Sequence, residues 1–296
     1  MARSRILVVG ANGNLGRAII ALLGPDRAIA ATRSTATAPD GFDHMCLAAD
    51  GTPLADGLAD CDAVINAAGR VSGDRAALML ANVDLPQKIA VAAREAGVRK
   101  MIQVSSFSAY GPVEHIDAAT PVGPTSDYGR CKLQGDEAIA ALATADFAVE
   151  SLRLPFMFSR HNPGLLAPLL TLAQTVRMLP VVRGKAICRS MLTYADAAGA
   201  LVDCAADNLT GATMAADPLL FDYPLLAKLI EGEIGNRVRL FPISMRLATI
   251  VEAVAPAIGR RLFRSSVLDP SVNRMGKKAA GLDAELRAYI RDRYRV

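Results

Sequence analysis

The sequence predicts an α/β fold: a doubly wound parallel sheet followed by a smaller, irregular C-terminal lobe. Apolar runs of strand length alternate with Ala/Leu/Arg-rich stretches of helical period through about residue 155. Strands buried on both faces read as unbroken apolar runs, and their alternation with helices favours a parallel sheet with helices on both sides. After Pro155 prolines and glycines become frequent, and no regular alternation restarts, so we expect a less regular lobe there.

The predicted elements follow one another without a linker or an internal repeat. One helix is predicted over Asn14–Leu23, ending at Gly24-Pro25, and a second over Leu85–Ala96, where Gly97 is placed as a C-terminal cap. The predicted strands are Arg5–Val9, Ala28–Thr32, Ala63–Asn66, Lys100–Ser105 and Ala148–Leu154.

Composition narrows the function classes. The chain has 296 residues, of which 52% are hydrophobic and 21% charged, enough to bury a large core. Lys and Arg number 33 against 29 Asp and Glu, and they are scattered, so nucleic acid is not an expected partner. The five cysteines form no CxxC pair and the three histidines lie far apart. Neither a metal site nor a disulfide framework is predicted, and a reducing compartment fits best.

Two segments bear on membranes. The apolar run at the N-terminus is too short for a signal peptide, so a cytoplasmic protein is expected. Leu247–Ile258 is interrupted by Glu252 and Pro256 and falls short of the roughly 20 apolar residues that a transmembrane segment needs, so none is predicted. The wider segment 246–264 is either a basic interfacial helix on a membrane surface or a helix of the C-terminal lobe. Pro256 favours the second, because it interrupts a continuous apolar face.

A glycine-rich turn follows the first strand and opens the first helix. Glycines at this place allow a tight turn and a close approach of the backbone to a pyrophosphate, and the helix N-terminus supplies N–H donors. The alternative is an ordinary strand-to-helix turn, but the position in the chain favours a Rossmann dinucleotide site. Its expected contacts are Gly10, Asn12, Gly13, Asn14, Leu15 and Gly16.

The end of the second strand bears on which dinucleotide binds. An acidic residue there suits the ribose 2′-hydroxyl of NAD, whereas a 2′-phosphate needs a cation. The chain has Thr32-Arg33-Ser34 and no acid. Arg33, helped by Thr32 or Ser34 and by Arg17, therefore favours NADP, while a solvated Arg33 would leave NAD possible.

Two further segments are candidate cofactor contacts. Asp50 suits the adenine edge, and Ala67, Ala68 and Gly69 provide small residues at the end of the third predicted strand. Either segment is equally compatible with simple packing.

A tyrosine and a lysine stand four residues apart in Tyr128-Gly-Arg-Cys-Lys132, so both project from one helical face. A nearby ammonium lowers the pKa of a phenol, which then exchanges a proton with a hydroxyl or carbonyl while a hydride moves to or from nicotinamide. Ser106, at the carboxyl end of a strand, is placed to hydrogen-bond the reacting oxygen. The alternative is an exposed tyrosine stacked on a lysine stem.

Four motifs together resemble the extended branch of the short-chain dehydrogenase/reductase family, also called the NAD-dependent epimerase/dehydratase family. They cover about the first 160 residues and are Gly10-x-x-Gly13-x-x-Gly16, Asn82-Val-Asp, Val104-Ser-Ser-Phe-Ser-Ala-Tyr-Gly111 and Tyr128-x-x-x-Lys132. The resemblance implies residues 1–160 as the dinucleotide-binding Rossmann domain. It implies 161–296 as mainly a substrate-binding lobe, with some segments returning to the Rossmann core.

The resemblance also implies residue roles. Tyr128 is the catalytic acid/base, and Lys132 orients the nicotinamide ribose and lowers the Tyr128 pKa. Ser106 is the catalytic serine, with Ser105 and Ser108 as the nearest rivals. Further contacts implied by similarity are Pro155 for the cofactor, and Asn162 and Arg189 for the substrate, Arg189 through its bidentate geometry toward a diphosphate.

The chain departs from the family pattern in two places. Residues 158–161 read Phe-Ser-Arg-His where relatives usually have Tyr-Gly-Pro, so this segment does not identify the substrate. Phe107-Ser108 replaces the acidic pair beside the catalytic serine that is typical of sugar dehydratases, which argues against a 4,6-dehydratase.

The function expected from the resemblance is an NAD(P)-dependent oxidoreductase that reduces a 4-keto group on a nucleotide-linked sugar. The alternatives are a nucleotide-sugar 4-epimerase with retained NAD, a non-catalytic NADP-binding sensor or assembly protein, and an enzyme for a ketone, lactone or steroid without a nucleotide. Similarity also suggests a homodimer packed through the helices that contain Leu85 and Tyr128.

Overall fold

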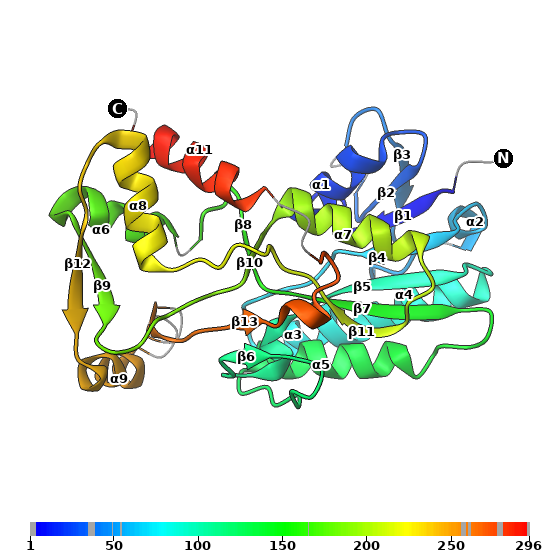
Figure 1. Cartoon of the computed structure of the whole chain (residues 1–296). Coiled ribbons are helices and arrows are strands. Elements are labelled where there is room, and N and C mark those ends of the chain that lie inside the picture. The colour runs from blue at the N-terminus through cyan, green and yellow to red at the C-terminus, as the bar shows by residue number, and fades with distance from the viewer. Residues whose placement is uncertain are drawn as a thin grey trace. The chain divides into compact units, whose positions relative to one another are not determined.

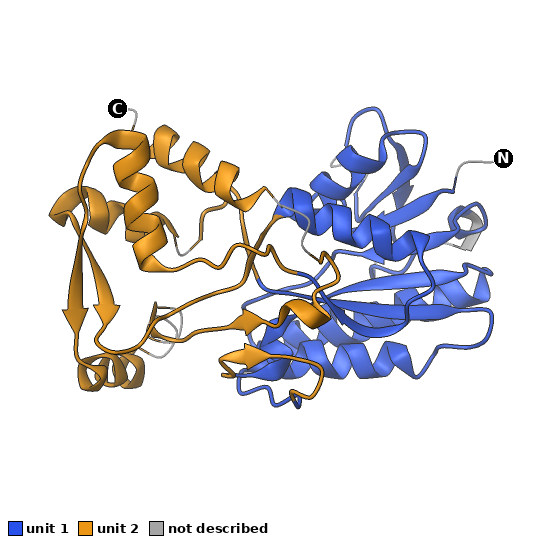
Figure 2. Ribbon diagram, in the orientation of Figure 1, with its two compact units in different colours: residues 1–111, 121–155, 194–215 blue, residues 112–120, 156–193, 216–296 orange. Residues whose placement is uncertain are grey.

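The structure is a computed structural model that describes residues 4–34, 39–48, 50–53, 55–164, 166–255, 259, 262–276 and 281–294. Its chain forms two compact units that do not follow a single cut in the sequence (Figure 2). The first unit comprises 1–111, 121–155 and 194–215, and the second comprises 112–120, 156–193 and 216–296.

A sheet of seven parallel strands forms the centre of the first unit (Figure 1). The strand order is β3-β2-β1-β4-β5-β7-β11, so the direction of winding reverses between β1 and β4. This doubly wound order confirms the predicted fold class, and ligands of such sheets bind at the carboxyl ends of the strands near the reversal. The strands are β1 (Ile6–Val9), β2 (Ala28–Thr32), β3 (Asp43–Cys46), β4 (Ala63–Asn66), β5 (Lys100–Ser106), β7 (Ala148–Leu154) and β11 (Gly211–Met214).

Helices cover both faces of this sheet. α1 and α7 pack together on one face, and α4 and α5 lie on the other (Figure 1). Apolar side chains from the strands and from α4 and α5 form one buried cluster that includes Val64, Ile89, Met101, Ile139 and Phe147. The helices are α1 (Asn14–Leu23), α2 (Ala55–Leu58), α3 (Arg75–Met79), α4 (Leu85–Glu95), α5 (Asp127–Ala140) and α7 (Tyr194–Ala206), with a π-helical turn at Leu80–Asp84 and a 3₁₀ turn at Phe107–Tyr110.

Among the described residues, four helices and three two-stranded parallel ribbons build the second unit. α6 and α8 pack with α11 around a core that contains Phe158, Leu170, Leu229 and Ile290. The ribbons pair β10 with β8, β12 with β9 and β13 with β6. The elements are β6 (His115–Ile116), β8 (Phe156–Phe158), α6 (Leu166–Val176), β9 (Met178–Val182), β10 (Met191–Thr193), α8 (Tyr223–Ile234), β12 (Arg239–Ile243), α9 (Met245–Val254), β13 (Val267–Leu268), a 3₁₀ turn (Pro270–Val272) and α11 (Leu282–Tyr294). No helix of the described residues is long and apolar enough to cross a membrane.

The predicted strands agree with the structure apart from their ends. β1 begins at Ile6 rather than Arg5, and β5 runs to Ser106 rather than Ser105. α4 ends at Glu95, one residue before the predicted end, and Gly97 follows with a φ of +78°. Two strands of the sheet were missed, β3 and β11, because both are short edge strands that expose half or more of their residues and lack an apolar run.

Helix α5 lies unusually close to its neighbours because of two glycines. A Cβ on Gly135 would stand 2.1 Å from the carbonyl oxygen of Asn82, and a Cβ on Gly129 would stand 2.4 Å from that of Ser108. Neither neighbour is a side chain that can rotate away, since both contacts are with backbone atoms. The two glycines therefore set the distance of α5 from the π-helical turn and from the end of β5.

Replacing Gly135 by alanine is expected to destabilise the protein by about 2 kcal/mol or more, because backbone must shift to admit the methyl group. Gly199, inside α7, is a matched control, because a Cβ there has no neighbour within 4 Å. Gly199→Ala is expected to stabilise the helix by about 0.5–1 kcal/mol. Free energies of unfolding in urea measure both effects, and similar values for the two variants would contradict the steric argument.

Candidate active site

The turn between β1 and α1 has a geometry that requires glycine at two positions. Gly10 has a φ of +82°, and a Cβ on it would stand 2.8 Å from the Ala68 amide nitrogen. A Cβ on Gly16 would stand 2.1 Å from the Gly10 carbonyl oxygen. The turn therefore packs against the loop after β4 and against the first turn of α1 at once, next to the reversal point of the sheet.

The N-terminus of α1 lacks the cap that other helices of the chain have. Side chains cap α3, α5, α8 and α9, through Asp74, Ser126, Asp222 and Ser244, whereas Gly13 gives α1 no side-chain acceptor. The first turn of α1 also contains no acidic residue. Uncapped N–H groups at the positive end of a helix dipole form an anion site, so the predicted loop fits the pyrophosphate of a dinucleotide.

The end of β2 presents a cation beside two hydroxyl groups. The Thr32 hydroxyl donates to the Ser34 carbonyl oxygen over 2.8 Å and also contacts His44 Nε2 at 2.7 Å. Thr32 is buried by these contacts, while Arg33 and Ser34 are exposed. Arg33 is thus an accessible cation at the end of β2, and its contact with a 2′-phosphate stays a prediction.

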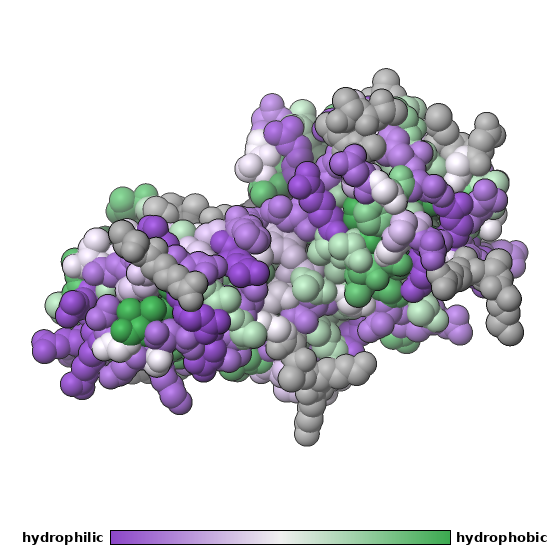
Figure 3. Space-filling model, turned by 90° about the horizontal axis from the view of Figure 1, so that it is seen from above, coloured by the Kyte–Doolittle hydropathy of each residue, from purple (hydrophilic) through white to green (hydrophobic). Residues whose placement is uncertain are grey.

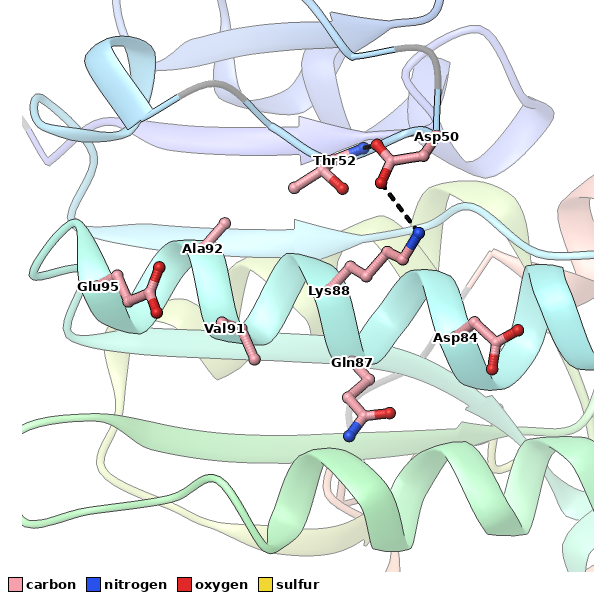
Figure 4. A pocket seen from close by; sticks show the side chains of 8 residues that line it. All are labelled: Asp50, Thr52, Asp84, Gln87, Lys88, Val91, Ala92 and Glu95. Atoms are coloured by element: carbon pink, nitrogen blue, oxygen red, sulfur yellow. Dashed lines mark hydrogen bonds and ion pairs between the residues drawn. The ribbon is translucent and has the colours of Figure 1, made fainter.

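Asp50 lines an open hollow of about 490 Å³ beside α4 (Figure 4). Its carboxylate accepts from Lys88 Nζ at 2.9 Å and from the Thr52 amide at 3.0 Å. The Lys88 hydrogen bond, followed by those to Thr52, lowers the pKa of Asp50 to about 2. Because Lys88 and Thr52 already hold this carboxylate, contact with an adenine ring stays a prediction. The lining residues are Asp50, Thr52, Asp84, Gln87, Lys88, Val91, Ala92 and Glu95.

The loop after β4 is held by buried amides. Asn66 donates to Gln103 Oε1 at 2.8 Å and accepts from the Ala68 amide at 3.1 Å, which fixes the small residues Ala67 and Ala68 beside the glycine turn. A Cβ on Gly69 would stand 3.3 Å from Lys132 Nζ, so this loop passes directly over the lysine. Small residues are therefore required where the loop, the glycine turn and α5 meet.

Lys132 is buried, and its ammonium group donates to the Val104 carbonyl oxygen at 2.9 Å. Burial lowers the Lys132 pKa to about 8, although the charge of Asp136 opposes the change. An ammonium has three donors, so a single backbone acceptor leaves two for other partners. The side chain is thus fixed in place with donors still to be satisfied.

The structure brings Ser106 and Tyr128 together. The Ser106 side chain lies close enough to Tyr128 to lower the pKa of its phenol, and the Ser106 hydroxyl donates to Ser108 Oγ at 3.2 Å. The Ser105 hydroxyl points the other way, into the interior, and donates to Asp136 Oδ2 at 2.8 Å. Among the three serines, Ser106 is therefore the one that lies beside the phenol.

The expected lowering of the Tyr128 pKa by Lys132 does not occur in this structure. Burial raises the pKa of Tyr128 above its ordinary value, the hydrogen bond from Ser106 lowers it in part, and the Asp136 charge adds to the increase. Desolvation disfavours the phenolate more strongly than the hydrogen bond favours it. Tyr128 accordingly stays protonated at neutral pH.

Two residues behind the site were missed from the sequence. Asp136 is buried one helical turn beyond Lys132, and its Oδ2 accepts from Arg153 Nε at 3.2 Å as well as from Ser105. The Arg153 guanidinium lies over the Tyr110 ring at 5.0 Å. The available signals were the spacing of four residues from Lys132 and a charged residue inside the apolar run of β7.

The other predicted contacts lie at or beyond the end of β7. Pro155 directly follows β7 at the end of a segment of the first unit. Asn162 and Arg189 belong to the second unit, where the Asn162 amide donates to the Ser159 carbonyl oxygen at 3.0 Å and Arg189 Nη2 donates to the Arg264 carbonyl oxygen at 2.5 Å. Their roles toward a substrate stay predictions.

Comparison with known proteins agrees with this geometry. A family model described as "NAD dependent epimerase/dehydratase family" matches residues 6–202, which is about two thirds of the chain and includes the glycine turn, Ser106, Tyr128 and Lys132. The chain belongs to this family. The match confirms the resemblance carried by the four sequence motifs.

Similar individual proteins point to the same family. A dTDP-4-dehydrorhamnose reductase of Sinorhizobium fredii (strain NBRC 101917 / NGR234) is 30% identical over 192 residues, which are 62% of this epimerase/dehydratase-family chain and 61% of the relative. The chain thus spans about three fifths of the length of that curated relative.

Solved structures share the fold. The UDP-glucuronic acid 4-epimerase from Bacillus cereus, in complex with NAD, is 16% identical with a TM-score of 0.73, covering 98% of this chain and 100% of that one. The UDP-N-acetylglucosamine 4-epimerase from Methanobrevibacter ruminantium M1 is 15% identical with a TM-score of 0.75, covering 98% of both chains. At such low identity the comparison supports the fold of this family member.

Replacing Lys132 by methionine is expected to change how stability depends on pH. The folded-state pKa of about 8 lies below the ordinary value of 10.5, so between these values the unfolded chain holds a proton that the folded protein has lost. Stability of the wild type therefore rises with pH in this window. Lys132→Met removes the buried ammonium, so the variant is expected to be more stable than the wild type at about pH 7.5. This difference in the free energy of unfolding should decrease by about 2 kcal/mol between about pH 7.5 and about pH 9.5.

Urea unfolding at the two pH values measures this difference, and Lys228→Met, at an exposed position on α8, is the control. A difference between Lys132→Met and wild type that does not change with pH would show that the buried ammonium costs nothing in this range.

Proposed function

We propose that this protein is an NADP-preferring oxidoreductase that reduces a 4-keto group on a nucleotide-linked sugar. The observation that carries the proposal is that Ser106 lies beside Tyr128, one helical turn from the buried ammonium of Lys132 and next to a glycine turn that suits a dinucleotide. The relative at 30% identity, named a dTDP-4-dehydrorhamnose reductase, supports the reductase assignment and the nucleotide-sugar substrate class.

The proposed reaction divides the work between the cofactor and three side chains. Reduced nicotinamide, when bound, supplies the hydride that bonds to the carbonyl carbon of the substrate. Ser106 donates a hydrogen bond to the carbonyl oxygen and holds it beside Tyr128, and Tyr128 delivers the phenolic proton to that oxygen as the C–O double bond becomes single. The product is the alcohol, and Tyr128 is left as phenolate.

Lys132 assists proton transfer through its charge and cofactor binding through its N–H donors. Its ammonium stabilises the phenolate that forms on Tyr128, and its two remaining N–H donors suit the hydroxyl groups of the nicotinamide ribose. Tyr128 begins protonated at neutral pH, as the proton donor of this reaction must. A 4-epimerase instead begins by removing a proton from a sugar hydroxyl.

A nucleotide-sugar 4-epimerase with retained NAD is the second candidate, supported by the two 4-epimerases among the similar folds. The two functions differ in whether the cofactor exchanges. Chromatography of nucleotide released from the denatured protein distinguishes them: empty protein that takes up NADPH supports the reductase, and stoichiometric bound NAD supports the epimerase.

Tyr128→Phe is expected to lower turnover of NADPH with 4-keto nucleotide sugars by about 10²–10⁴-fold, because the proton donor is lost while the ring remains. The dissociation constant for NADPH, measured by nicotinamide fluorescence, should stay nearly unchanged. The chain contains no tryptophan, which keeps the background low. Tyr294→Phe, in the last turn of α11, is the control, and a Tyr128→Phe enzyme with most of its activity would contradict the assignment.

Arg33→Ala is expected to weaken NADPH binding by about tenfold or more and to leave NADH binding nearly unchanged, because only the 2′-phosphate loses a charge-assisted hydrogen bond. Fluorescence titration of both cofactors measures the ratio, with Arg94→Ala, at an exposed position of α4, as the control. An equal loss for both cofactors would assign Arg33 to the shared part of the dinucleotide, and no loss would leave it a solvated side chain.

The homodimer expected through α4 and α5, the cytoplasmic location and the absence of nucleic-acid partners belong to the same proposal. Each follows from the family resemblance and from composition, as argued from the sequence.

A further inference from the structure

The ribbon of β9 and β12 in the second unit has two apolar faces. Residues that alternate along a strand share a face, and residues paired across two strands do so as well. Leu179 and Val181 face the core of α6 and α8. On the opposite face, Val182 and Ile243 pack against α9, and residues toward the other end of the ribbon are exposed.

The uncovered part of this face carries large apolar side chains. Met178 is 42% exposed and Phe241 is 55% exposed, although both lie on the same face as the buried Val182 and Ile243. Arg239 pairs with Met178 in the ribbon, so a cation stands on this face beside the apolar groups. Surface apolar residues scattered singly need no explanation, but a continuous face does.

Helix α9 extends this surface because it is apolar on two sides. Ala248 and Val251 pack inward against Val182 and Ile243. A second stripe at the spacing i, i+3, i+7 faces away from that core and is exposed: Leu247 at 46%, Ile250 at 57% and Val254 at 82%. An ordinary surface helix has polar residues on its outer side, so this stripe indicates a further partner.

The charges of this surface have one sign. Residues 176–195 and 236–251 contain no Asp or Glu, and Glu252 forms an ion pair with Arg264 at 2.8 Å. Five exposed arginines lie along the ribbon and on α9, and none forms an ion pair with any residue that the structure describes. They are Arg177, Arg183, Arg237, Arg239 and Arg246.

We propose that the outer face of β9, β12 and α9 binds the surface of an anionic lipid bilayer. Exposed apolar side chains mixed with arginines match an interface where the apolar groups enter the acyl boundary and the guanidinium groups meet headgroup phosphates. A second copy of the chain fits less well, because a symmetric contact through this face would bring the unpaired Arg239 and Arg246 against their counterparts. The binding is peripheral, since no described helix is able to cross a membrane.

On the face of the molecule seen in Figure 3, apolar residues form separate groups bordered by hydrophilic ones. The proposed surface combines exposed apolar residues of the ribbon, Met178 and Phe241, with the exposed stripe of α9, and α9 itself packs against Val182 and Ile243 of the ribbon. Pro256 follows this helix in the sequence, so the apolar stripe is short and the ribbon provides the rest of the surface.

Flotation of the full-length protein with vesicles tests the proposal. We expect binding to vesicles that contain phosphatidylglycerol, little binding to pure phosphatidylcholine, and release in about 0.5 M salt, because charge attraction is screened. The double variant Arg239→Gln/Arg246→Gln should bind on the order of 30-fold more weakly. Phe241→Ser/Ile250→Ser should also lose binding, by about tenfold or more.

Matched controls use equally exposed residues of the first unit. Leu209→Ser, at a position 52% exposed, and Arg94→Gln are expected to bind vesicles like the wild type. Circular dichroism and NADPH titration confirm that each variant folds and keeps its cofactor site. Vesicle binding needs no substrate or turnover, so its outcome is independent of the proposed reductase activity.

Four outcomes would overturn the proposal, and the first three concern vesicle binding. The wild type does not float with anionic vesicles, or the face variants float as well as the controls, or binding is equal on neutral and anionic lipid. Size-exclusion chromatography with light scattering tests whether a second copy of the chain covers this face instead. A wild-type oligomer that Phe241→Ser/Ile250→Ser converts to monomer assigns the face to that second copy and overturns the lipid assignment.

Discussion

The burial of one ammonium group, that of Lys132, is the constraint on which the packing around the candidate site depends. Lys132 is held by a single backbone carbonyl, that of Val104, inside a region where charge is costly. To place it there, α5 must approach the sheet and the π-helical turn closely, which its glycines permit. The loop after β4 must then pass over the ammonium with no side chain at Gly69. Three separate segments are thus shaped around one charge.

A second buried charge system supports the first. Asp136 holds Ser105 and Arg153, and Arg153 covers the Tyr110 ring. This arrangement occupies the hydroxyl of Ser105 and leaves the neighbouring Ser106 directed toward Tyr128. The division of labour between adjacent serines is therefore fixed by a carboxylate on another element. Since Asp136 also raises the pKa of both Lys132 and Tyr128, its charge acts on the site without contacting the substrate.

The sequence predicted those strands and helices whose residues follow a local hydrophobic pattern. The first sheet's central strands are continuous apolar runs, and α1 has a clear period and a glycine stop, so their bounds agree with the structure within a residue. β3 and β11 were missed because edge strands bury one face at most and read as polar segments. The contacts of Asp136 with Ser105 and Arg153 join residues 31 and 17 positions apart, which periodicity does not report. Similarly, the sequence suggested a basic apolar helix near residue 250, but only the pairing of β9 with β12 adds the second surface beside it.

The uncapped start of α1 has a consequence for the free enzyme. The first N–H groups of α1 have no side-chain acceptor and hydrogen-bond to solvent instead. The first turn of this helix is therefore less stable than the capped first turns of α3, α5 and α8. A pyrophosphate bound as proposed would supply the missing acceptor. Occupancy of the proposed dinucleotide site and the local rigidity of the glycine turn would then be coupled, at a helix end that has no side-chain cap of its own.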